Sequence, residues 1–76
     1  MPRKPRPVSG LTLRSVQMRV HQIRKNQGDV ETAHGMEDYL WQEVLQTIAD
    51  GTAEDPAALA RAALKTTELD FDRWYA

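Results

Sequence analysis

Apolar residues recur at helical spacing along most of the chain, and no segment alternates apolar and polar residues as a half-buried strand does. The first periodic segment covers about residues 12–26. Its apolar positions fall at spacings of 3, 4 and 3 and define one narrow helical face: Leu13, Val16, Val20 and Ile23. Thr12 or Ser9 is placed to cap this helix, and Gly28 follows as a stop signal. The pattern predicts a helix with one thin buried stripe.

A second, broader stripe predicts a helix over about residues 30–49. Asp29 stands at its N-cap position, and Gly51 follows its last apolar residue. The residues on its broad face are Val30, Ala33, Leu40, Trp41, Val44, Leu45 and Ile48. Because only a short connection separates the two helices, we expect an antiparallel helical hairpin.

A third helix is predicted over about residues 56–66. Asp55 is its N-cap, and Pro56 occupies the first helical position, where a missing N–H is no loss. Its many alanines favour close docking on the hairpin, and a short C-terminal helical segment rich in aromatic residues follows. The sequence therefore predicts an all-α small helical bundle. We expect its core to include Val20, Ile23, Leu40, Val44, Ile48, Leu64, Phe71 and Trp74.

Length and composition narrow the class of protein. Seventy-six residues, of which 28% are charged and 41% hydrophobic, suit one small folded domain, which we place over residues 11–76. Residues 1–10 are expected to form a flexible Pro/Arg-rich basic tail. The absence of Cys excludes disulfides and Cys-ligated metal sites. A core of this size supplies only about 3–5 kcal/mol of folding stability, so self-association is a plausible substitute for disulfides or bound metals.

Charge divides the chain into two parts although the formal net charge is only −1. Residues 1–27 hold seven basic residues and no acidic one, whereas residues 28–76 hold eleven acidic and three basic ones. A basic face attracts phosphates or acidic proteins at long range. Alternatively, the basic part lies against the acidic part, either in the same chain or across a dimer. Both interpretations remain open at this point.

Two segments resemble a known group of proteins. They are Ala33-His34, followed by Glu37-Asp38, and the ending Leu69-Asp70-Phe71-x-Arg73-Trp74. Over about residues 28–76 the chain resembles small uncharacterised proteins of actinobacteria and of the phages that infect them. The resemblance implies a phage-type or bacterial protein located in the cytoplasm. If the protein is phage-encoded, this is the cytoplasm of the bacterial host. It brings no assigned activity, and the Pro/Arg tail lies outside the matched part.

Candidate metal chemistry rests on Glu31 and His34, which share a helical face at i, i+3, with Asp38 one turn further on. A carboxylate-bridged two-metal bundle needs this motif twice, and His21 has no acid near it. We therefore expect His34 to be a partly buried helix residue bonded to Asp38 or to the acidic C-terminal part. The sequence predicts no metal site and no cofactor.

Glu37 interrupts the apolar stripe of the second helix. A carboxylate in such a position is costly unless it is paired, so we expect a guanidinium to reach it. Arg73, Arg61 and the arginines of the first helix are the candidate donors. A pair that fixes helix register is a better explanation than a catalytic carboxylate.

The sequence gives little support to nucleophilic catalysis, because Ser9 and Ser15 are its only serines, and it contains no glycine-rich phosphate loop. We predict that the protein is not an enzyme and has no catalytic residues. The favoured function is a helical protein–protein interaction module, with homo-oligomers included among its partners and no membrane association. Its candidate interface residues are Met18, Met36, Trp41 and Leu45. The alternative is a nucleic-acid-binding accessory factor. Its candidate contacts are Arg3, Lys4, Arg6, Arg14, Arg19, Arg24 and Lys25.

Overall fold

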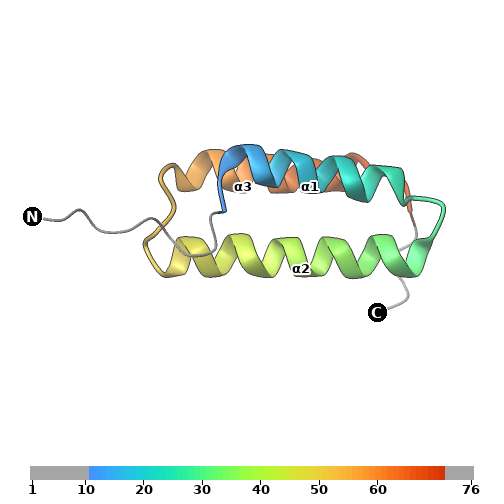
Figure 1. Cartoon of the computed structure of the whole chain (residues 1–76), viewed down its shortest axis with the longest axis horizontal. Coiled ribbons are helices and arrows are strands. Elements are labelled where there is room, and N and C mark those ends of the chain that lie inside the picture. The colour runs from blue at the N-terminus through green and yellow to red at the C-terminus, as the bar shows by residue number, and fades with distance from the viewer. Residues whose placement is uncertain (1–10, 72–76) are drawn as a thin grey trace, which may run out of the picture.

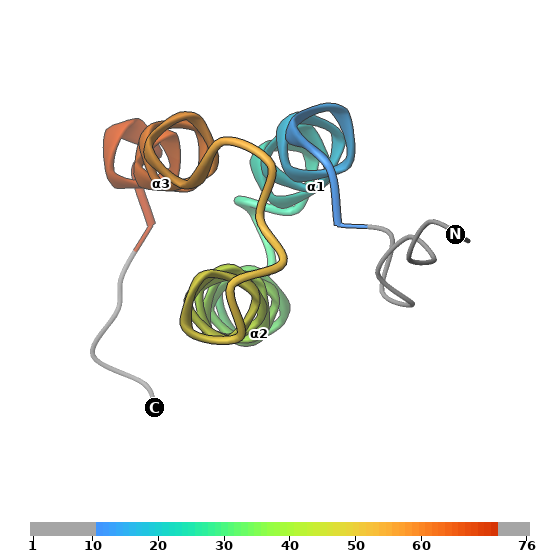
Figure 2. The ribbon, with the colours of Figure 1, turned by 90° about the vertical axis from the view of Figure 1, so that its left-hand side faces the viewer.

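The computed structural model describes residues 11–71, and within this range the chain is an all-α bundle without strands. Its helices are α1 (Leu13–Lys25), α2 (Val30–Ala49) and α3 (Pro56–Leu64), and the 3₁₀ helix η1 (Lys65–Glu68) extends α3. α1 and α3 lie side by side, and α2 runs beneath both (Figure 1). Viewed along the helices, the three axes form a triangle (Figure 2). The predicted all-α fold class and hairpin are confirmed. The predicted C-terminal helical segment lies partly outside the described residues, and its described part, residues 69–71, is not helical.

The start of α1 is held by a reciprocal cap. The Ser15 backbone N–H donates to Thr12 Oγ1 at 3.1 Å, and the Thr12 backbone N–H donates to Ser15 Oγ at 2.9 Å. Two N–H groups that the helix itself leaves unbonded are thereby satisfied. Of the two caps that the sequence offered, Thr12 is the one used.

α2 begins and ends where the sequence predicts. Asp29 accepts a hydrogen bond from the Thr32 backbone N–H at 3.3 Å. At the other end Gly51 adopts a φ of 74°, a left-handed conformation that favours glycine. Its N–H donates to the Ile48 carbonyl at 3.0 Å, and the next N–H, of Thr52, donates to the Thr47 carbonyl at 3.1 Å. This pair of bonds is a Schellman motif, and it turns the chain towards α3.

α3 starts at its predicted cap, because Asp55 accepts from the Ala58 backbone N–H at 3.1 Å and Pro56 follows. It ends earlier than expected, at Leu64 rather than near residue 66. Two threonine hydroxyls donate back to the last carbonyls of the helix, Thr66 to Ala63 at 3.2 Å and Thr67 to Leu64 at 2.7 Å. These bonds accompany the tighter 3₁₀ turn of η1.

The core lies along the axis of the triangle and draws on all three helices. Its buried apolar residues are Leu11, Val16, Val20, Ile23, Ala33, Leu40, Val44, Leu59, Ala62, Ala63, Leu69 and Phe71. Ile48 is partly buried against this core, and Trp74 lies outside the described residues.

One prediction about the core is wrong, namely that Leu64 is buried. Leu64 is 52% exposed, because it stands five positions after the buried Leu59 and therefore about 140° round the helix. The narrow inner face of α3 is taken by Leu59, Ala62 and Ala63.

The end of the described chain is tied to the hairpin turn. Gln27, in the α1–α2 connection, accepts a hydrogen bond through Oε1 from the Asp70 backbone N–H at 3.0 Å. Leu69 and Phe71, on either side of Asp70, are buried. This contact closes the bundle at the hairpin end. None of the helices in residues 11–71 is long and apolar enough to cross a bilayer.

Candidate interaction surfaces

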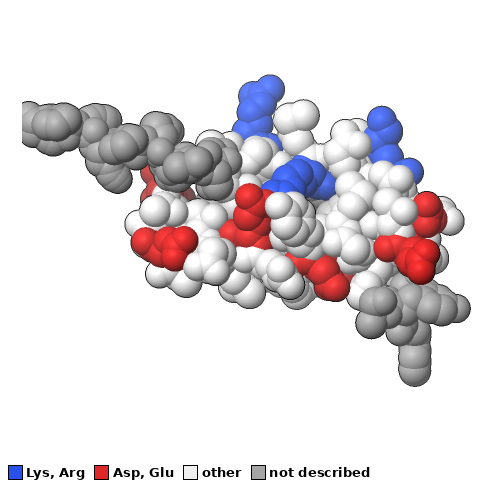
Figure 3. Space-filling view, turned by 60° about the horizontal axis from the view of Figure 1, so that its bottom comes forward, with Lys and Arg blue, Asp and Glu red and all other residues white. Residues whose placement is uncertain are grey.

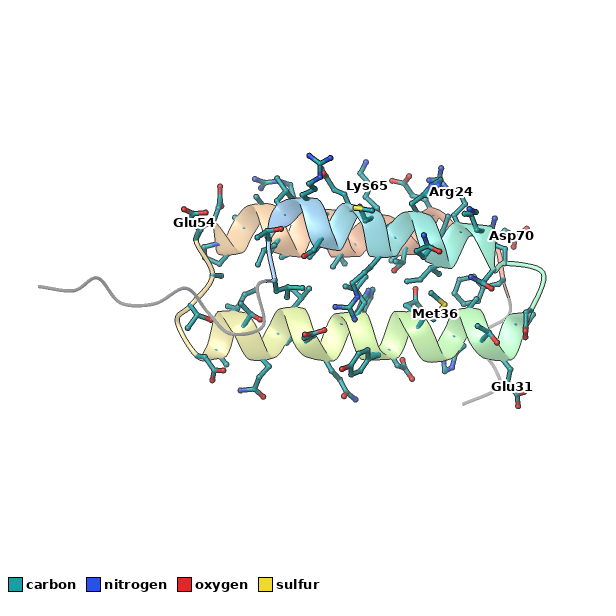
Figure 4. All side chains as sticks on the ribbon, in the orientation of Figure 1. Arg24, Glu31, Met36, Glu54, Lys65 and Asp70 are labelled. Atoms are coloured by element: carbon teal, nitrogen blue, oxygen red, sulfur yellow. The ribbon has the colours of Figure 1, made fainter. Side chains whose placement is uncertain are left out.

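The outward side of α1 carries basic residues and one methionine. Residues that follow one another at spacings of 4, 3 and 4 on this side are all exposed, and we call them the basic ridge: Arg14, Met18, His21 and Lys25. Met18, at 56% exposure, is the large apolar side chain of the ridge. Arg24 projects from α1 away from the bundle (Figure 4). Within residues 11–71, Arg14, Arg24 and Lys25 form no ion pair.

Arg19 differs from the other cations of α1 because it faces α2. Its Nη1 donates to Glu43 Oε1, and both side chains are partly buried. Its guanidinium also lies over the ring of Tyr39, 5.2 Å from the centroid. Arg19 thus joins α1 to α2, and among the α1 cations it is the one that the described fold neutralises. Tyr39, 64% exposed, was missed by the sequence analysis, although its place outside the apolar stripe was a signal.

The outward side of α2 carries acids in place of cations. Three exposed residues repeat there at intervals of seven, and we call them the acidic ridge: Glu31, Asp38 and Leu45. Glu31 points away from the bundle on the side opposite Arg24 (Figure 4). Acidic side chains are spread over the face that α2 turns to the viewer in Figure 3, and cations stand mainly at its upper edge. The bundle is therefore electrically polar.

The four predicted interface residues fall into two groups. Met18 and Leu45 are exposed, at 56% and 63%. Met36 and Trp41 are partly buried and pack against the core, and Met36 points from α2 towards the other helices (Figure 4). The Trp41 indole N–H donates to Thr66 Oγ1 at 3.1 Å and to the Ala63 carbonyl at 3.3 Å. Trp41 therefore joins α2 to α3, which leaves Met18 and Leu45 as the surface pair.

His34 lies on α2 with its side chain only 15% exposed, and its Nδ1 is 3.9 Å from Asp38 Oδ2. This is the partly buried arrangement that the sequence analysis preferred. Glu31 is exposed and points outward. Residues 11–71 contain no group of three His, Cys, Asp or Glu side chains able to hold a metal ion. The absence of a functional metal stays a prediction for the whole chain.

Glu37 is buried, with 5% exposure, as its position in the stripe predicts, and its side chain is not without a partner. Among the predicted donors, Arg19 binds Glu43, and Arg61, Arg14 and Arg24 are exposed. Arg73 lies outside the described residues, so its pairing with Glu37 stays a prediction.

The other candidate nucleic-acid contacts, Arg3, Lys4 and Arg6, also lie outside the described residues. The structure therefore places four of the seven candidates, all of them on α1. In comparisons with protein-family models, curated proteins and solved structures, none matches this chain.

Proposed function

We propose that this protein is a small helical protein–protein interaction module without catalytic activity. The observation that supports the proposal is that large apolar side chains remain on the outside after three helices have closed the core. Those exposed by more than 40% are Leu13, Met18, Tyr39, Leu45 and Leu64. These side chains are available for contact with a partner.

Met18 and Leu45 carry the proposal furthest, because each belongs to a ridge of charged residues. Single exposed apolar residues are ordinary on protein surfaces. An apolar residue next to residues of like charge combines the two parts of an interface, an apolar centre that loses its water and a polar rim that selects the partner. The resemblance to small actinobacterial and phage proteins supports placing this module in a bacterial cytoplasm.

A capture experiment tests this function. The tagged full chain is immobilised and exposed to nuclease-treated actinobacterial lysate to which untagged chain has been added. A second bait carries Met18→Gln with Leu45→Gln, and a control bait carries Gln17→Ala with Gln42→Ala at neighbouring exposed positions. We expect a protein, identified by mass spectrometry, that wild type and control retain and the Met18/Leu45 bait loses. Equal retention by all three baits contradicts the proposal.

The alternative is a nucleic-acid accessory role, and one observation favours it. Arg14, Arg24 and Lys25 are exposed and unpaired within residues 11–71, and Arg3, Lys4 and Arg6 precede them in sequence. Cations of this kind reach phosphates but do not by themselves read bases. Binding to any duplex should then fall steeply with salt, and deletion of residues 1–7 should remove most of it while the helical content is kept. Tight, sequence-dependent binding near 0.15 M salt favours this role over the module.

A further inference from the structure

We infer that the partner is a second copy of this chain, with the basic ridge of one molecule docked antiparallel on the acidic ridge of the next. The inference rests on the proposed function and specifies its partner. Opposite charge on two outer faces of one bundle, together with an apolar residue at a matching place on each, carries it.

The two ridges have the same spacing between charge and apolar residue. On α1, Lys25 follows Met18 by seven positions, and on α2, Asp38 precedes Leu45 by seven. Seven residues correspond to about 10.5 Å along a helix axis and to nearly the same side of it. When the helices run antiparallel, Met18 meets Leu45 of the second copy at the level where Lys25 meets its Asp38.

The other end of the contact has no matching charge pair. Asp50 follows Leu45 by five positions, which places it about 140° round α2 from the acidic ridge, so it does not face Arg14. The contact therefore consists of one apolar pair, Met18 with Leu45, and one opposite-charge pair, Lys25 with Asp38. A parallel docking of the same ridges separates these two charges instead.

The fold leaves these charges available. Arg14 and Lys25 form no ion pair within residues 11–71, and Asp38 has only the 3.9 Å approach to His34. Arg19 and Glu43, which do pair inside the molecule, face each other across α1 and α2 and belong to neither ridge. Ion pairing within the molecule thus neutralises the inner charges, Arg19 and Glu43, and does not neutralise the charges of the two ridges.

The position of the ridges determines the kind of assembly. α1 and α2 occupy different corners of the triangle and turn their outer sides in different directions (Figures 2 and 4). One contact joins two different surfaces and is therefore heterologous, so repetition gives open chains or a closed ring. A contact between single helix faces is small, which makes the association weak and concentration-dependent.

An acidic or apolar protein surface fits the basic ridge better than a nucleic acid does. Phosphates give Met18 no apolar surface to cover, whereas Leu45 of a second copy does. The acidic ridge also repels nucleic acid and attracts the basic ridge. A second copy is thus the partner for which both halves of the contact are described.

Sedimentation velocity of the purified full chain tests the inference over a range from micromolar to millimolar concentration. At about 0.01 M salt we expect the average mass to rise with concentration, and at about 1 M salt the rise should shrink because the charges are screened. Lys25→Glu and Asp38→Lys should each weaken association by on the order of tenfold, since an exposed attractive pair contributes a factor of at most about five and reversal makes it repulsive. The two substitutions together should restore association, because the pair is re-formed with its signs exchanged.

Arg61→Glu is the matched control. It makes the same change of charge on α3, where Arg61, like Lys25, is exposed and forms no ion pair within residues 11–71, and it should leave association near the wild-type level. Circular dichroism checks that each variant keeps its helices. A monomer at all concentrations, single reversals no stronger than the control, or a double variant as weak as the single ones would each overturn the inference.

The outcomes also separate this inference from the proposed function. A monomeric chain that still retains another protein through Met18 and Leu45 overturns the second-copy partner and leaves the module intact. A different result overturns both the second-copy partner and the interaction module: no protein is retained through Met18 and Leu45, and Lys25→Glu weakens binding to a nucleic-acid duplex. The basic ridge is then assigned to phosphate binding.

Discussion

Leu40 and Leu45 are the same residue type on the same helix, yet Leu40 is fully buried and Leu45 is 63% exposed. The periodic pattern assigned both to one broad apolar face of α2. Only the inner part of that face is covered, because α1 and α3 meet it at the centre and leave its flanks to water. The comparison between the inner and outer faces separates two tasks. The inner face stabilises the bundle, and the outer faces are available for partners.

The largest effect expected from this comparison is on stability. Leu40→Ala should lower the free energy of unfolding by about 2–5 kcal/mol, because it removes buried methyl groups and leaves a cavity. Leu45→Ala should change it by no more than about 0.5 kcal/mol, since the side chain is already largely hydrated. Urea unfolding followed by circular dichroism measures both. Equal losses for the two variants would show that the inner and outer faces of α2 are assigned wrongly.

What the sequence predicted well is local. Thr12, Asp29 and Asp55 cap helices through bonds that span three residues, and Gly51 ends α2 through its own backbone conformation. Such signals act within one turn of the chain, so neighbouring residues are sufficient to read them. Helix number, order and most boundaries follow from them.

The features that the sequence did not predict depend on which helices pack against one another. Leu64 is a large apolar residue of the type found in cores, but the third helix is covered on one narrow side only. Trp41 was expected at an interface, and it uses its indole N–H to reach Thr66, 25 residues further along the chain. Arg19 reaches Glu43 and Tyr39 in the same way. These roles depend on the packing of segments distant in sequence, and helical periodicity gives no information about that packing.

Glu37 offers a test of charge on the inner face. If Arg73 is its donor, Arg73→Met should cost about 1–3 kcal/mol, because a buried carboxylate loses its cation. Glu37→Gln in the same background should recover part of that loss. Arg61→Met is the control, because Arg61 is exposed, and it should cost little. A double-mutant cycle with no coupling between positions 37 and 73 would refute the pairing.

Gly51 and Gly28 sharpen the comparison at the ends of α2. Gly51→Ala should destabilise the bundle by about 1–2 kcal/mol, because a Cβ disfavours the positive φ of 74°. Gly28 has no positive φ, and nothing lies within 4 Å of the place where a Cβ would stand. Gly28→Ala should therefore be neutral or slightly stabilising. Thermal melts of both variants measure the difference, and equal melting temperatures would argue against the Schellman ending.

Gly35 is the smallest test, and it concerns the outer face alone. It lies in the middle of α2, is exposed, and has nothing within 4 Å of the position that a Cβ would take. A glycine inside a helix destabilises it by about 0.5–1 kcal/mol relative to alanine, and no contact within the described bundle requires one here. Gly35→Ala should therefore raise the melting temperature by about 2–8 °C. The measurement is made at low protein concentration, where molecules are separate. A fall in melting temperature would show that the outer side of α2 is already covered within the monomer, and the distinction between inner and outer faces would then fail at this position.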